Sequence, residues 1–253
     1  MNPFPAGAKV NLEGVERQFD LSVVAKLDLA IRSGEFVSLL GPSGCGKSTL
    51  LRLIAGLDEP DGGRLVIESF GRKFFRAFVF QEAALLPWRD TLGNVMLPLE
   101  LMGREKSAAR RDAEATLVKV GLADSLTKFP SQLSGGMKMR VSVARALVTQ
   151  PSLLLLDEPF AALDENARFG LQEDLRSLWQ SARMTTVFVT HSVQEAVYLS
   201  DRAVVLSPRP ARILLDREIA LPVMRPASIR TDAAFIHEME TIQKSYLVGE
   251  KTQ

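Results

Sequence analysis

The strongest constraint on the fold is a glycine-rich segment near residue 45. Residues Gly41-Pro-Ser-Gly-Cys-Gly-Lys-Ser48 fit the pattern G-x-x-x-x-G-K-[ST]. The apolar run 35–40 before it is typical of a buried strand, and a helix-forming run follows from Lys47 to Gly56. Because glycines leave room for backbone N–H groups to approach an anion, this order of strand, loop and helix predicts a phosphate-binding site in an α/β fold.

Several residues of this loop have predicted roles toward a nucleotide. Lys47 is expected to reach the β- and γ-phosphates, Ser48 to coordinate Mg²⁺, and Thr49 to place a hydroxyl near the α-phosphate. Cys45 is predicted to fill space, because no histidine lies nearby in the sequence to activate a thiol. The alternative is a glycine-rich turn without a ligand. The residues expected to surround the nucleotide are Gly41, Pro42, Ser43, Gly44, Cys45, Gly46, Lys47, Ser48 and Thr49.

Two adjacent carboxylates follow a second apolar run. Residues 152–156 read as a strand buried on both faces, and it delivers Asp157 and Glu158 to the carboxyl end of a sheet, where α/β proteins bind ligands. Asp157 suits the Mg²⁺ shell beside Ser48, and Glu158 suits polarisation of a water for attack on the γ-phosphate. Taken alone, the pair could also be a turn that ends a strand.

A second helix start resembles an anion site. Leu133-Ser-Gly-Gly-Met137 opens a helical run to Val148, with Ser134, Gly135 and Gly136 at its beginning. A single triphosphate needs only one phosphate loop, so we expect this second site to hold a nucleotide bound by another copy of the chain. The alternative is that Ser134 simply caps a core helix.

Composition and charge exclude several classes of protein. The 253-residue chain is 46% hydrophobic and 24% charged, which suits a soluble globular protein and excludes a disordered chain. Its net charge of +1 gives no support to nucleic-acid binding through bulk positive charge. No apolar run approaches the roughly 18 residues of a membrane helix, so work at a membrane is expected to require a partner that spans it.

The pattern along the chain predicts one domain with an inserted helical part. Strand-like runs occur before residue 90 and return at 152–156 and 185–189, where the intervening helices favour parallel strands. A last amphipathic helix is predicted at 231–247. Within a single domain 1–253, we expect a core with its β subdomain at 8–89 and 151–220, a helical subdomain at 90–150 and a C-terminal helical extension at 221–253.

These motifs, in this order, resemble those of the ATPase subunit of ABC transporters over about residues 8–220. In that family the loop 41–49 is the Walker A motif, Asp157 and Glu158 close the Walker B strand, and residues 133–137 are the signature. The resemblance implies an α/β fold: a P-loop NTPase (RecA-like) parallel-sheet core with an N-terminal antiparallel β subdomain and an inserted α-helical subdomain.

The resemblance also assigns four isolated residues. Gln81 matches the Q-loop, Asp164 the D-loop and His191 the switch histidine, and Phe19 lies where the family places an aromatic that stacks on adenine. It implies that Gln81 contacts Mg²⁺ or water. The residues expected to be catalytic are Glu158, His191, Gln81 and Lys47. By themselves, Phe19 could be a core aromatic, Gln81 an ordinary amide at a strand end and His191 a structural histidine.

One branch of the family fits best. Met137 stands where glutamine is usual and Met139 where a polar residue is usual, which puts a side-chain contact from position 137 to nucleotide in doubt. The LSGGM form of the signature, together with Leu86-Pro-Trp-Arg89 after the Q-loop, resembles the importers of nitrate, sulfonates and taurine.

The function implied is that of the ATP-hydrolysing subunit of an importer. Two copies, arranged head to tail, are expected to hold two ATP molecules with Mg²⁺ between them. The dimer is expected at the cytoplasmic face of the cell membrane. Membrane permease subunits and, indirectly, a solute-binding protein are the expected partners, without nucleic acid. No C-terminal regulatory β-domain is expected. The alternatives are an ABC ATPase outside transport and a small-molecule P-loop kinase, which would leave residues 133–137 unexplained.

Overall fold

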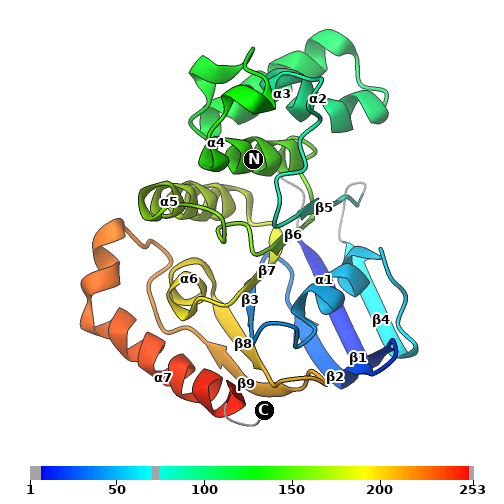
Figure 1. Ribbon diagram of the computed structural model, residues 1–253, viewed down its shortest axis with the longest axis vertical. Helices are drawn as coiled ribbons and strands as arrows, with labels where there is room; N and C mark the ends of the chain where they lie inside the picture. Colours follow the sequence, from blue (N-terminus) through cyan, green and yellow to red (C-terminus); the bar gives the residue numbers. More distant parts are fainter. Residues whose placement is uncertain (1–6, 70–73, 251–253) are drawn as a thin grey trace.

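The computed structural model describes residues 7–69 and 74–250. Two sheets and the helices around them form one body, and a separate group of helices, α2, α3 and α4, lies at one end of it (Figure 1). Within the residues described, no helix combines the length and the apolar character that crossing a membrane requires.

The larger sheet has six strands and is mostly parallel. All neighbouring pairs are parallel except β8 and β9, which are antiparallel. Leu40 pairs with Thr190, and Asp157 with Val189, so β3, β6 and β7 end at the same edge. The loops that follow these strands therefore meet there, as α/β ligand sites require. The order is β5 (Arg76–Val79), β6 (Leu153–Asp157), β7 (Thr185–Thr190), β3 (Phe36–Leu40), β8 (Arg202–Leu206) and β9 (Ile213–Glu218).

The smaller sheet is antiparallel and is formed by the N-terminal part of the chain. Strand β1 (Ala8–Gln18) lies between β2 (Ser22–Ile31) and β4 (Gly62–Ser69). Buried residues alternate with exposed ones over much of β1 and β2, as expected for a sheet with one face against the core. The expected parallel core and antiparallel β subdomain are both confirmed.

The continuous apolar run in β6 has a simple explanation. Leu153 and Leu155 pack toward α1 (Lys47–Ala55) and the antiparallel sheet, whereas Leu154 and Leu156 pack toward α5 (Glu165–Ala182) and α6 (Val193–Leu199). Successive side chains of a strand point to opposite faces. Because both faces of this sheet are covered, every position of β6 before Asp157 is buried.

The inserted helices have a hydrophobic core of their own. They are α2 (Thr91–Leu101), α3 (Lys106–Lys119) and α4 (Gly135–Leu147), with short 3₁₀ turns at Ala123–Ser125 and Pro130–Gln132. Val95, Leu117 and Val141 are fully buried in a cluster that these helices share. The helical insertion predicted by the family resemblance is confirmed.

The C-terminal segment packs back on the sheet. A 3₁₀ turn (Ala227–Thr231) precedes α7 (Ala233–Glu250), and α7 contacts α6, β8 and β9. Buried Arg225 donates hydrogen bonds to the carbonyls of Val197, Tyr198 and Ser200 at the end of α6, and burial lowers the pKa of Arg225 to about 10. Helix α7 starts two residues after the predicted position, because Asp232 separates it from the 3₁₀ turn.

Candidate nucleotide site

The glycine-rich loop joins β3 to α1, and its backbone requires glycine. Gly46 has φ 115°, a left-handed conformation, and a Cβ there would lie 3.0 Å from the carbonyl oxygen of Val23. A Cβ on Gly41 would lie 2.8 Å from the sulfur of Cys45. No side chain caps the start of α1, so its first backbone N–H groups remain able to bind an anion. A phosphate chain therefore fits this loop.

Lys47 lies across the mouth of the loop. Its side chain is only 4% exposed, and its amine donates hydrogen bonds to the carbonyls of Gly41 at 2.7 Å and Pro42 at 2.9 Å. An ammonium group has three donors, so one remains for a ligand. The cavity beside it is lined by Ser43, Gly44, Gly46, Lys47, Ser48, Thr49, Gln81, Glu158 and Arg209.

The structure gathers most of the residues predicted for the phosphates around this cavity. Gly41, Pro42 and Cys45 are buried and do not line it. The buried position of Cys45 agrees with a space-filling role, and burial raises the pKa of its thiol. Arg209 was not predicted; the only signal was its place between two prolines in Ser-Pro-Arg-Pro210, which indicated no more than a rigid turn.

The Lys47→Ala variant is expected to bind ATP about 10- to 150-fold more weakly, because one charged hydrogen bond contributes roughly 1.5–3 kcal/mol. Titration of the nucleotide-free protein with ATP measures the change. Lys138→Ala, a half-buried lysine of α4 outside the cavity, is the control. Equal affinities for Lys47→Ala and wild type would contradict the role of Lys47.

Oxygen atoms suited to Mg²⁺ meet beside the loop. The hydroxyl of Ser48 donates to a carboxylate oxygen of Asp157 at 2.9 Å; burial raises the pKa of Asp157, and this hydrogen bond opposes the rise. Gln81 lines the same cavity and has no hydrogen bond within the described part of the chain. Residues 7–69 and 74–250 contain no cluster of three His, Cys, Asp or Glu side chains that could hold a metal. This donor set fits Mg²⁺, which is usually bound by one or two protein groups together with phosphates.

Glu158 and His191 meet at the edge of the sheet. Glu158 directly follows β6, and its Oε2 atom lies 3.1 Å from Nδ1 of His191, which directly follows β7. A carboxylate oxygen accepts this hydrogen bond when Nδ1 of the imidazole carries the proton. The backbone N–H of Glu158 donates to the carbonyl of Val189, which holds the turn against β7. A carboxylate and an imidazole thus lie together at the edge of the sheet, and Glu158 also lines the phosphate cavity.

Phe19 lies on the surface, in the turn between β1 and β2. Its side chain is 56% exposed, which excludes a core role, and the guanidinium of Arg17 lies 4.6 Å from its ring centroid. It is not among the residues that line the phosphate cavity. This position leaves one face of an aromatic ring for a planar base, and stacking on adenine stays a prediction.

The Phe19→Ala variant is expected to bind both ATP and GTP about 5-fold or more weakly than wild type. Stacking contributes roughly 1–3 kcal/mol to binding and barely distinguishes one base from another. Leu21→Ala, at a 68% exposed residue of the same turn, is the control. Fluorescence titration with each nucleotide measures the effect. Unchanged affinities for both nucleotides would exclude stacking.

The second predicted anion site lies away from this cavity. Ser134 caps α4 and accepts a hydrogen bond from the N–H of Met137, and Asp164 caps α5 in the same way. The two helix starts are neighbours, since a Cβ on Gly136 would lie 3.1 Å from Cβ of Ala167. The residues Ser134, Gly135, Gly136 and Asp164 do not line the cavity that contains Lys47 of the same chain.

The two unexpected methionines of the signature helix are packing residues. Met139 is 3% exposed and lies in the core beneath α5, and half-buried Met137 packs against the cluster of the inserted helices. A helix that must contact both cores accommodates apolar side chains at these positions. The two methionines therefore differ from the residues usual in the family without altering the exposed start of α4 at Ser134 and Gly135.

A family model described as ABC transporter matches residues 24–161, which is more than half of the chain. The chain belongs to the ABC transporter family. Among the curated relatives of this ABC protein, an uncharacterized ABC transporter ATP-binding protein of Methanocaldococcus jannaschii is 43% identical over 243 residues, covering 92% of this chain and 90% of the relative. Aliphatic sulfonates import ATP-binding protein SsuB 1 of Mesorhizobium japonicum is 48% identical over 217 residues, covering 85% and 80%.

A solved structure extends the comparison to the nucleotide. The ATP-binding cassette MJ0796, in a dimeric post-hydrolysis state bound to ADP and Pi, matches with a TM-score of 0.74 and 29% identity, over 84% of this chain and all of that one. The ABC protein described here is accordingly an ATPase. The fold and the activity expected from the sequence are confirmed, and the kinase alternative is wrong.

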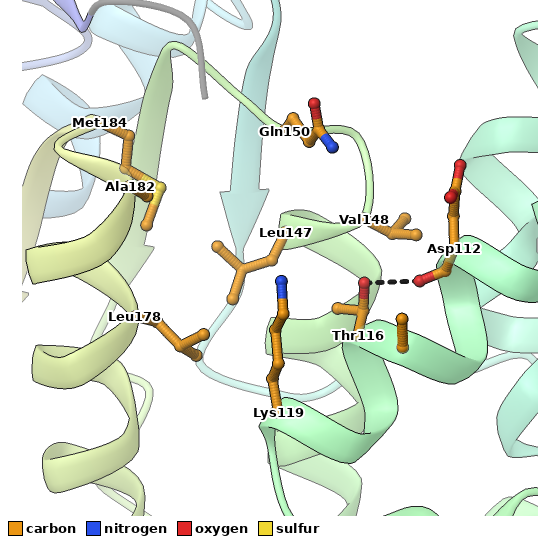
Figure 2. A pocket seen from close by; sticks show the side chains of 10 residues that line it. Asp112, Thr116, Lys119, Leu147, Val148, Gln150, Leu178, Ala182 and Met184 are labelled. Atoms are coloured by element: carbon orange, nitrogen blue, oxygen red, sulfur yellow. Dashed lines mark hydrogen bonds between the residues drawn. The ribbon is translucent and has the colours of Figure 1, made fainter. Parts of the chain in front are cut away.

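A second cavity of this ABC protein lies between the inserted helices and the core. Its lining includes Leu147 and Val148 near the end of α4, Leu178 of α5, Met184 beyond it and Lys119 of α3 (Figure 2). Thr116 on the same helix is occupied by a hydrogen bond to the carbonyl of Asp112. None of the residues predicted to bind nucleotide or Mg²⁺ lines it.

Proposed function

We propose that this ABC ATPase energises an importer of small organic anions of the aliphatic sulfonate class. The observation that carries the proposal is the 48% identity to a sulfonate import protein over 85% of the chain. The related SsuB of Mycobacterium sp. is 47% identical over 87% of both chains. Nitrate and taurine are among the other solutes that the sequence suggested. Solute choice itself is assigned to the partner proteins, because no residue of an ATPase subunit needs to contact the solute.

Within this proposal, the main residues predicted from the sequence have separate roles toward the triphosphate. Lys47 and the N–H groups of the loop bind the β- and γ-phosphates, and Ser48 and Asp157 hold Mg²⁺ with Gln81 nearby. Bound Mg²⁺ neutralises charge on the phosphates. Glu158, which lines the cavity, accepts a proton from the attacking water, and His191 lies 3.1 Å from it at the same edge of the sheet.

We infer further that hydrolysis occurs between two copies of the chain. Ser134, Gly135, Gly136 and Asp164 of one copy are proposed to face the ATP held by Lys47 of the other copy. Two points support this arrangement: these residues do not line the cavity of their own chain, and the solved cassette is dimeric. ATP can drive closure only because it binds the closed dimer more tightly than the open one.

The proposed membrane partner is a permease, with the ATPase at the cytoplasmic face of the membrane and a solute-binding protein acting on the other side. The segment after Gln81 supports a contact of this kind. Trp88 there is 71% exposed, and α2 begins at Thr91 immediately after it. An exposed tryptophan on the surface next to the inserted helices suits attachment to an apolar partner.

A growth experiment tests the solute. A strain deleted for this gene is expected to grow on sulfate but not on ethanesulfonate as the only sulfur source, and plasmid-borne wild type should restore growth where Glu158→Gln does not. Normal growth of the deletion strain on sulfonates would contradict the proposed solute. Loss of growth of the deletion strain on nitrate as the only nitrogen source would instead identify nitrate as the transported solute. Co-purification with nucleic acid and without a membrane protein would favour an ABC ATPase outside transport.

A further inference from the structure

Arg209 is a cation at the phosphate cavity without a counter-charge. It lies in the turn between β8 and β9, is exposed and lines the cavity together with Lys47. Its guanidinium makes no hydrogen bond or ion pair to any residue within 7–69 and 74–250. The guanidinium of Arg209 is therefore available to an anion in the cavity.

The turn that carries Arg209 lies against the phosphate loop and against strand β2. The N–H of Ala211 donates to the carbonyl of Val23 at 2.8 Å, and a Cβ on Gly46 would lie 3.6 Å from Cβ of Ala211. Ser207 closes the other side of the turn, since its hydroxyl accepts from the N–H of Arg212 and its own N–H donates to the carbonyl of Arg212. The prolines on both sides of Arg209 restrict its backbone further.

The charge of Arg209 acts on the loop itself. Burial raises the pKa of the Cys45 thiol, and the positive charges of Lys47 and Arg209 both oppose that rise. Two cations thus act on the glycine-rich loop, one from within it and one from the β8–β9 turn. A guanidinium presents several donors in one plane and pairs well with phosphate oxygens.

We propose that Arg209 binds the phosphate chain of the nucleotide as a second cation beside Lys47. The role deepens the proposed function, because it depends on the phosphates lying in the cavity that Lys47 borders. Arg209 supplies affinity for the phosphates and not for the base. The contribution of Arg209 is smaller than that of Lys47, because water screens an exposed guanidinium more than a buried amine.

The test compares Arg209→Ala, Arg209→Lys and Arg212→Ala in binding of ATP, ADP and adenosine to the monomer. Arg212 is the matched control, since it is exposed on the same turn but does not line the cavity. Arg209→Ala should weaken the binding of ATP and ADP about 3- to 10-fold and leave the binding of adenosine unchanged. Arg209→Lys should recover part of the loss, and Arg212→Ala should match wild type. The advantage of wild type over Arg209→Ala should shrink as NaCl is raised.

Other results would overturn the inference. Equal ATP affinities for Arg209→Ala and wild type exclude a phosphate contact. An equal loss of ATP affinity in Arg212→Ala would show a general effect of surface charge. A loss of adenosine affinity in Arg209→Ala would show that Arg209 only supports the turn. The Lys47→Ala variant distinguishes failure of the proposed phosphate site from failure of the proposed role of Arg209. If it also binds ATP normally, the proposed placement of the phosphates fails; if it binds ATP weakly while Arg209→Ala does not, only the role of Arg209 fails.

Discussion

The Glu158→Gln variant is expected to bind ATP with near wild-type affinity and to lose about 100- to 10,000-fold of its turnover, the range that a general base contributes. The amide keeps the size of the side chain and can still contact Nδ1 of His191, which lies 3.1 Å from Oε2 in the wild type. It cannot accept the proton of the attacking water. ATP titration and phosphate release, measured on the same preparation, separate binding from chemistry.

This variant should also accumulate as an ATP-bound dimer, because closure occurs and the reaction that reopens the dimer does not. Light scattering with ATP and Mg²⁺ detects it. Glu240→Gln, at an exposed residue of α7 far along the chain from the cavity, removes the same charge and should behave as wild type. Phosphate release by Glu158→Gln within a few-fold of wild type would exclude Glu158 as the base.

The second large effect is expected for Ser134→Arg at the start of α4. Ser134 is exposed and caps this helix, so the arginine side chain projects from the surface that is proposed to meet the other copy. We expect normal ATP affinity in the monomer, no ATP-dependent dimer and little hydrolysis. The helix cap itself contributes only about 1 kcal/mol, so the variant should still fold. Ser131→Arg, at an exposed serine three residues earlier, is the control.

Mixing two inactive variants tests the head-to-tail arrangement directly. A dimer of one Ser134→Arg chain and one Lys47→Ala chain has one site altered by both changes and one site altered by neither. Partial recovery of hydrolysis on mixing is therefore expected, and no recovery would contradict the arrangement. If Ser134→Arg weakened ATP binding to the monomer, the start of α4 would serve the nucleotide of its own chain.

The sequence was most informative where chemistry depends on neighbouring residues. The loop from Gly41 to Ser48 is defined by local backbone geometry, so its glycines and Lys47 could be recognised before any tertiary contact was known. The run before Asp157 was equally clear, because four consecutive leucines suit a strand that is buried on both faces. The ATPase activity and the family followed from these segments and their order.

Isolated residues were harder to place. Phe19 and His191 carry no local pattern, and only the family resemblance assigned them roles. The exposed ring of Phe19 and the contact of His191 with Glu158 depend on where a hairpin and a strand end lie in the folded chain. Similarly, the apolar character of Met139 is explained only by the contact between α4 and the core.

By itself, the sequence determined the phosphate loop, the carboxylates that end β6 and the capped start of α4, because each is set by residues that are adjacent in the chain. The tertiary structure alone decided that Arg209 joins Lys47 at one cavity and that the start of α4 lies beside α5 and not beside its own phosphate loop. The meeting of Arg209 and Lys47 follows from the strand order β5-β6-β7-β3-β8-β9, which places β8 next to β3 although more than 160 residues separate them. Local propensity carries no information about such an order, because it arises from how helices cover both faces of the sheet.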